Sequence, residues 1–208
     1  MKKICHRPRM AIGHGIMRVV LVSLGLTALS SCGDRAPMPT VGSVDLNRFM
    51  GRWYVIAHIP TFMEKTAHNA IETYRLSGDG TIETRFAFND GAPDGPSKVY
   101  TAKGFVQNTE TNALWKMQFI WPFKAEYRIV YLSEEYSLTM IGRSKRDYLW
   151  VMARRPAITD KQYQQMNELA KELGYDTRQI RRVPQVDAAA QGKEALTPAN
   201  PKDRSINP

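Results

Sequence analysis

The sequence predicts an all-β fold: an eight-stranded up-and-down antiparallel barrel, with one C-terminal α-helix packed outside it. Short segments of alternating apolar and polar residues follow one another, separated by turn signals such as 78–80. Trp53 lies at the start of the first segment and Arg154 ends the last, and a guanidinium can lie on an indole ring. If the two meet, the first and last strands are neighbours and the sheet is closed. A sandwich is the competing architecture, and it would keep Trp53 and Arg154 apart.

The strands are placed by period-two alternation and by the turns that bound them. In chain order we expect strands at 53–59, 69–76, 81–88, 98–107, 113–120, 127–132, 137–142 and 148–154. Eight strands in this arrangement enclose room for one small ligand.

A helix follows the last strand. Thr159 is placed to cap it, Gln162 completes a capping box, and Gly174 marks its end. Its apolar residues recur at three- and four-residue spacing, which predicts a single apolar stripe that must pack on another surface. The stripe consists of Tyr163, Met166, Leu169, Ala170 and Leu173.

The N-terminus predicts export and lipidation. Basic residues precede the apolar run 19–29, which is typical of a secretory signal and too short for a lasting membrane span. Leu29-Ser30-Ser31-Cys32 fits a lipobox, in which the cysteine receives a diacylglyceryl group. Because Cys5 lies in the removed segment, the mature chain has no intramolecular disulfide. Several acyl chains on one cysteine give stable anchoring to a membrane.

Composition divides the chain into four segments. We expect a removed signal peptide at 1–31, a lipidated tether at 32–43, the barrel domain at 44–185 and a disordered tail at 186–208. The formal net charge is +9, and residues 1–31 hold five Lys or Arg and no acid, so removing them lowers it. No clustered basic face with interleaved aromatics is visible, and we expect no nucleic-acid partner.

The candidate pocket residues are the aromatic and sulfur-containing side chains that alternation places inside. Aromatic and methionine side chains make adaptable apolar walls, which suit a lipid chain with its head group at the mouth. We expect about half of the set to pack without touching a ligand. The set is Tyr74, Phe86, Phe88, Trp115, Met117, Phe119, Tyr127, Ile129, Tyr131 and Met140.

Three sequence regions carry a family resemblance. Gly51-Arg52-Trp53-Tyr54, Glu134-Glu135-Tyr136 and Asp147-Tyr148-Leu149-Trp150-Val151-Met152-Ala153-Arg154 resemble, in order and separation, the three conserved regions of the lipocalins. The chain is similar to the bacterial outer-membrane lipoprotein lipocalins, to apolipoprotein D and to the plant temperature-induced lipocalins.

This resemblance implies structural roles for several residues. It implies that Trp53 and Arg154, with Gly51, close one end of the barrel and that a short ninth strand follows at 178–183. It also implies that the loops 60–69, 90–96 and 121–125 lie together at the open mouth of the barrel. Because Gly33 rather than Asp follows Cys32, it also implies an anchor in the outer membrane, on the periplasmic face.

The expected function is that of a non-enzymatic carrier. The resemblance implies transport or storage of a fatty acid, such as palmitate, a lysophospholipid or a similar amphiphile, for envelope maintenance. An enzyme on the same fold, an isomerase or de-epoxidase acting on a bound lipid or polyene, is the alternative, and Glu72 is the carboxylate to test first. A third reading is a structural lipoprotein whose pocket is vestigial.

The sequence predicts no cofactor, no metal and no catalytic residue. The mature chain holds only His58 and His68, without Cys, Asp or Glu at metal-ligand spacing, so we expect surface or loop histidines. The oligomeric state is not determined, which leaves a homodimer open.

Overall fold

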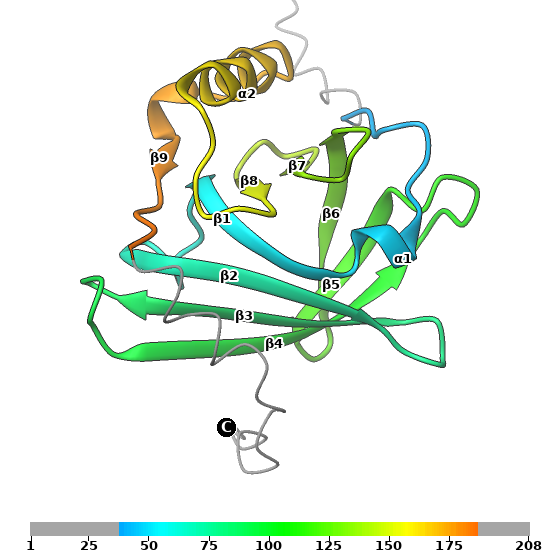
Figure 1. Ribbon diagram of the computed structural model, residues 1–208. Coiled ribbons are helices and arrows are strands. Elements are labelled where there is room, and N and C mark those ends of the chain that lie inside the picture. Colours follow the sequence, from blue (N-terminus) through cyan, green and yellow to red (C-terminus); the bar gives the residue numbers. More distant parts are fainter. Residues whose placement is uncertain (1–37, 187–208) are drawn as a thin grey trace, which may run out of the picture. The chain divides into compact units, whose positions relative to one another are not determined.

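A computed structural model describes residues 38–186. The predicted signal peptide, Cys32, half of the tether and all but the first residue of the predicted tail lie outside the described residues. Figure 1 shows a curled antiparallel sheet with helix α2 on its outer side. The barrel strands are β1 (Gly51–Ile59), β2 (Ala67–Leu76), β3 (Ile82–Asp90), β4 (Ser97–Val106), β5 (Leu114–Ile120), β6 (Phe123–Leu132), β7 (Leu138–Gly142) and β8 (Leu149–Ala153).

The barrel is closed through β1. Each strand pairs with the next from β2 to β8, and β1 pairs with both β8 and β2. Gly51 lies opposite Tyr74 on β2, while Tyr54 lies opposite Ala153 on β8. The predicted closed barrel is therefore confirmed, and the open sandwich is excluded.

The largest error in strand placement concerns β6. A loop is expected at 121–125, but β6 begins at Phe123 and pairs with β5 through Ile120 opposite Phe123. Only Trp121 and Pro122, joined by a cis peptide bond, connect the two strands. Phe123 and Lys124 are both exposed, so this part of the strand has no buried face that alternation could reveal.

Helix α2 (Asp160–Glu172) forms as the capping signals predict. Thr159 accepts a hydrogen bond from the Gln162 backbone and Gln162 reaches back to Thr159, which completes the capping box. Gly174 follows with φ +85°, a conformation that glycine adopts without strain. The helix buries Met166 and Ala170. Within residues 38–186, no helix is long and apolar enough to cross a membrane.

The short helix α1 (Leu46–Phe49) covers one end of the barrel. Asp45 caps it, and the Asp45 backbone N–H donates to the Tyr136 hydroxyl at 2.8 Å. The backbone of Val44 donates to Thr111 O, so this segment crosses from the β4–β5 loop to the β6–β7 turn. Four residues are too few for a periodic pattern, and the sequence analysis missed this helix.

Two apolar clusters lie on opposite sides of the wall. The interior cluster lies within the barrel, and the outer cluster lies between the wall and α2. The interior cluster includes Phe49, Trp53, Val55, Tyr74, Ile82, Phe86, Phe88, Trp115, Met117, Tyr127, Ile129, Ile141, Met152 and Val183. The outer cluster includes Tyr54, Ile56, Ile59, Ile71, Leu138, Met140, Leu149, Val151, Met166, Ala170 and Tyr175.

A C-terminal segment completes the wall where β1 and β2 separate. After α2 come the 3-10 helix η1 (Thr177–Gln179) and strand β9 (Arg181–Arg182), which pairs with β1. Val183 N donates to Ile56 O on β1, and Asn69 N on β2 donates to Pro184 O. The Gln185 side-chain amide donates to Val55 O and Ala70 O. Residues 181–186, here called the wall segment, thus bridge the two strands.

Candidate ligand-binding site

Trp53 and Arg154 seal the end of the barrel that α1 covers. The Arg154 guanidinium carbon lies 3.8 Å from the Trp53 ring centroid. Its nitrogens donate to the backbone carbonyls of residues 48–50, 52 and 136. Burial lowers the pKa of Arg154 to about 10, so the group stays charged at neutral pH. The contact that the sequence predicted is present.

Aromatic rings form the floor above this seal. Phe49 contacts Trp53, Tyr74 and Trp115, and the Trp115 and Tyr127 rings stack with centroids 5.0 Å apart. The hydroxyls of Tyr74 and Tyr127 lie 2.7 Å apart and share a hydrogen bond. Three of the predicted pocket residues, Tyr74, Trp115 and Tyr127, are thus brought into contact, and the two tyrosine hydroxyls are each other's hydrogen-bond partners.

The wall toward the open end carries further predicted pocket residues. Phe86 and Phe88 contact each other on β3, and Phe88 stacks on Tyr100 of β4. Met117 and Ile129 also belong to the interior cluster. Tyr100 was missed, although β4 alternates around it: Val99, Thr101 and Lys103 are exposed, and this alternation could have identified Tyr100.

Three predicted pocket residues lie elsewhere. Tyr131 and Met140 lie opposite each other on β6 and β7, on the outer side of the wall. Met140 belongs to the outer cluster and Tyr131 packs against it, while Phe119 is 38% exposed. The register of β6 shifts between Ile129 and Tyr131, and that of β5 shifts after Met117. A bulge adds a residue to one strand and reverses the side on which the following residues lie. All of β7 is buried on both faces, which removes the alternation that would have placed Met140.

Polar side chains are also buried inside the barrel. His58 on β1 pairs in register with Trp150, whose Nε1 donates to Glu64 Oε1 at 3.1 Å. His58 Nδ1 lies 4.0 Å from that oxygen, without a hydrogen-bond partner among the described residues. Burial, and then the charge of Arg181, lower the pKa of His58 to about 4. The expectation of a surface or loop histidine is therefore wrong for His58, since its strand turns it inward.

Glu72 is the most isolated of these groups. It lies on β2 between Trp53 of β1 and Phe86 of β3, its partners in register. Its Oε2 atom is buried and has no hydrogen-bond partner among residues 38–186. Burial, with a smaller effect of the Glu64 charge, raises the pKa of Glu72 to about 8. Glu72 is the residue that the sequence analysis selected for the enzyme alternative.

The open end of the barrel is formed by the loops between β1 and β2 and between β3 and β4, together with the β5–β6 turn. The first two loops are joined, because Gly91 N donates to Thr66 O and Asn69 Nδ2 donates to Pro93 O. Large apolar side chains are exposed here. They are Phe62, Ile120, Trp121 and Phe123, each of which is 64–83% exposed to solvent.

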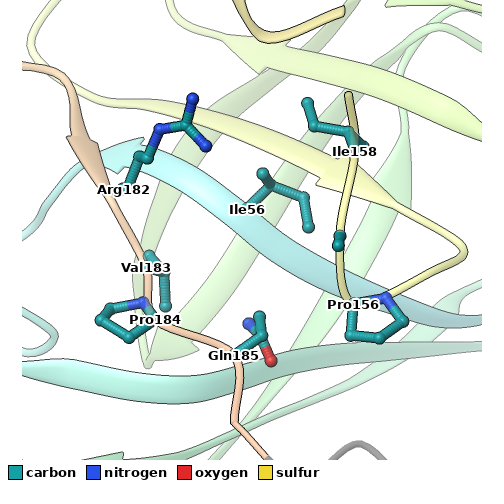
Figure 2. Close-up of a pocket in the computed structure, with 8 residues that line it drawn as sticks. Ile56, Pro156, Ile158, Arg182, Val183, Pro184 and Gln185 are labelled. Atoms are coloured by element: carbon teal, nitrogen blue, oxygen red, sulfur yellow. The ribbon is translucent and has the colours of Figure 1, made fainter. Parts of the chain in front are cut away.

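A pocket of about 320 Å³ lies beside the wall segment (Figure 2). It is bounded by β1, by the segment after β8 and by the wall segment. Ile56, which lines it, belongs to the outer cluster, so this pocket lies on the outer side of the wall. It is separate from the interior that the predicted pocket residues line.

A closed antiparallel barrel with one sealed end and an aromatic interior defines the class of small-ligand-binding barrels. Residues 44–185 match the family model described as a lipocalin-like domain, and the chain belongs to this family.

Relatives include bacterial, plant and animal proteins. The chain is 30% identical over 172 residues to the outer membrane lipoprotein Blc of Citrobacter freundii, covering 79% of this chain and 96% of the relative. It is 29% identical to temperature-induced lipocalin-1 of Arabidopsis thaliana, covering 78% of this chain and 90% of the relative. Mouse (Mus musculus) apolipoprotein D is 24% identical, with 70% of this chain and 80% of the relative covered. These relatives support a lipid-binding role.

Solved structures confirm the fold. Apocrustacyanin C2 superposes with a TM-score of 0.57 at 14% identity, and the match covers 77% of this chain and 97% of the apocrustacyanin chain. The cockroach allergen Per a 4 gives 0.54 at 17% identity, covering 74% of this chain and 98% of its own. At such low identity the likeness concerns the fold alone.

Proposed function

We propose that this protein is a non-enzymatic carrier that holds a fatty acid, a lysophospholipid or a similar amphiphile inside its barrel for envelope maintenance. The observation that carries the proposal is the interior cluster, whose aromatic and methionine side chains give an apolar chain a continuous lining. Each buried methylene of a ligand contributes about 0.8 kcal/mol, so a long chain supplies micromolar affinity after the cost of association.

Lipid anchoring at Cys32 would keep the barrel at the outer membrane, on its periplasmic face. Several relatives are outer membrane lipoproteins. Exposed apolar side chains at the open end, Trp121 and Phe123 among them, would allow the mouth to meet a bilayer. Cells labelled with radioactive palmitate test the anchor: wild type should carry label in the outer-membrane fraction and Cys32→Ser should carry none. Label that persists in Cys32→Ser would contradict it.

The ligand is tested by native mass spectrometry of the protein purified from cells. We expect a bound mass that extraction identifies as a fatty acid, a lysophospholipid or a similar amphiphile. As a control, the Cys32→Ser chain separates a ligand in the barrel from the anchor itself, and its sedimentation reports whether a homodimer forms. An empty barrel with no affinity for added palmitate or lysophosphatidylethanolamine would overturn the carrier proposal.

A second candidate is an isomerase or de-epoxidase that acts on a bound lipid or polyene. One observation favours it: Glu72 is buried with a pKa of about 8, so it would remain protonated at pH 7 and could donate a proton to a bound substrate. Turnover of a polyene or epoxide that disappears in Glu72→Gln, while binding of the same compound persists, would support the enzyme.

A further inference from the structure

The geometry points to a buried ammonium-binding site at Glu72, so that the carrier's ligand is a long-chain amine bound with its head group inward. This inference rests on the proposed carrier function and, among the amphiphiles that it covers, selects an amine over a fatty acid. It differs from the sequence-based expectation, which places the ligand's head group at the mouth.

The first argument is the placement of Glu72 between two rings. In an antiparallel sheet, residues that lie directly opposite each other point to the same side with Cβ atoms about 5 Å apart. Trp53 and Phe86 flank Glu72 in this way, and both belong to the interior cluster. Arg154 already covers the ring of Trp53, so a cation beside the carboxylate would meet the ring of Phe86. Aromatic faces attract ammonium groups, and more strongly when water is excluded.

The second argument is the missing counter-charge. The buried charged or polar side chains of residues 38–186 are His58, Glu64, Asn69, Glu72, Thr84 and Thr139, with no Lys or Arg among them. Glu72 Oε2 and Thr84 Oγ1 both lack a hydrogen-bond partner within this part of the chain. An isolated carboxylate in an apolar interior is costly, and a paired cation removes most of that cost. The described residues supply no such cation, so Glu72 holds a proton in the empty barrel, and a ligand ammonium group can replace that proton.

The third argument is that the remaining groups around the barrel interior disfavour an anion. Glu64 comes from the β1–β2 loop, His58 from β1, Tyr74 from β2 and Tyr127 from β6. None carries positive charge at neutral pH, because the His58 pKa lies at about 4, and Arg181, whose charge acts on His58, is exposed on β9. Arg154 lies against Trp53 and is occupied by backbone carbonyls. A fatty-acid carboxylate would find no cationic partner among these groups, whereas an ammonium group would find Glu72.

Three probes of one chain length test this site: dodecylamine, laurate and dodecanol, each titrated into the delipidated protein by calorimetry. At pH 8 we expect dodecylamine to bind about tenfold or more tightly than laurate, because one ion pair and ring contacts are gained. Glu72→Gln should lose this preference and keep its affinity for dodecanol. Glu135→Gln, a matched change at an exposed turn residue, should behave like wild type.

Proton release gives a second readout that a merely structural role would not produce. Binding an ammonium group forces Glu72 to ionise, so below pH 8 each bound amine should release close to one proton. The affinity for dodecylamine should therefore increase by up to about tenfold for each unit that the pH is raised toward 8. Calorimetry in buffers of different ionisation enthalpy measures this release. Glu72→Gln should release none.

The outcomes separate the two proposals. If dodecanol binds but dodecylamine shows no preference over laurate, or if Glu72→Gln retains the preference, the ammonium site is wrong and the carrier stands. If none of the three probes binds, both the carrier and the ammonium site fail.

Discussion

The Arg154 guanidinium lies over Trp53, with its carbon 3.8 Å from the ring centroid, although the two residues are about a hundred positions apart in the sequence. The same guanidinium donates to carbonyls of residues 48–50, so it joins β8, β1 and the segment around α1. Trp53 is fully buried and donates from Nε1 to Phe49 O at 2.8 Å. One contact thus holds three parts of the closed end together.

Trp53→Ala should destabilise the protein strongly. Truncating a buried aromatic leaves a cavity and typically costs about 3–5 kcal/mol, and here it also removes the partner of Arg154. Urea unfolding measures the loss. The relative affinities for different lipids should hardly change, because the contact lies at the sealed end. Trp121→Ala, at an 83% exposed side chain, is the control that should leave stability near wild type. An unchanged unfolding free energy in Trp53→Ala would refute the structural role.

Glu72→Gln should stabilise the unliganded protein at high pH. The pKa of Glu72 is about 8 in the folded state against an ordinary 4.5, so folding favours the protonated form. Wild-type stability is therefore unaffected by this group below pH 4.5, declines as pH rises toward 8, and is lower by an amount on the order of several kcal/mol above it. Urea unfolding at several pH values should show that the unfolding free energy of Glu72→Gln increases relative to that of wild type between pH 4.5 and 8. Parallel curves for the two proteins would contradict the assignment.

The hydrogen bond between Tyr74 and Tyr127 should appear as a coupling in a double-mutant cycle. Either Tyr→Phe change alone leaves a buried hydroxyl without its partner and should cost about 1–3 kcal/mol. The double change removes both hydroxyls, so its cost should be smaller than the sum of the single changes. Unfolding free energies of the four proteins give the coupling energy, and strict additivity would count against the bond.

Ending the chain after Ile180 should destabilise the barrel. This truncation removes β9, buried Val183 and the Gln185 bridge, which together should cost at least about 3 kcal/mol in lost burial and hydrogen bonds. A chain that ends after Val186 keeps the wall segment and is the control, which we expect to match wild type. Equal stability of the two truncated chains would show that the wall segment is dispensable. Thermal unfolding provides the comparison.

Local signals encode the strands and the helix, whereas the closing role of Trp53 and Arg154 follows from the family resemblance. Thr159 and Gln162 specify a capping box from four residues, and Trp53 and Arg154 are distinctive in type and separation. Bulges are encoded less clearly, since one extra residue in β6 moves Tyr131 to the outer side without any change in composition. The inward position of His58 and the isolation of Glu72 depend on which strands become neighbours, which no single segment reveals.

The wall segment also determines when the barrel can be finished during synthesis. Gln185 bridges to Val55, 130 positions earlier in the chain. The part of β1 from Val55 to His58, beyond its pairing with β2, therefore lacks its partner on that edge until translation has passed residue 185, and no shorter nascent chain can complete the wall. Such late, long-range closure is intrinsically slow. If the chain is exported as its first 31 residues predict, this delay would leave the wall incomplete while the polypeptide threads through a translocation channel.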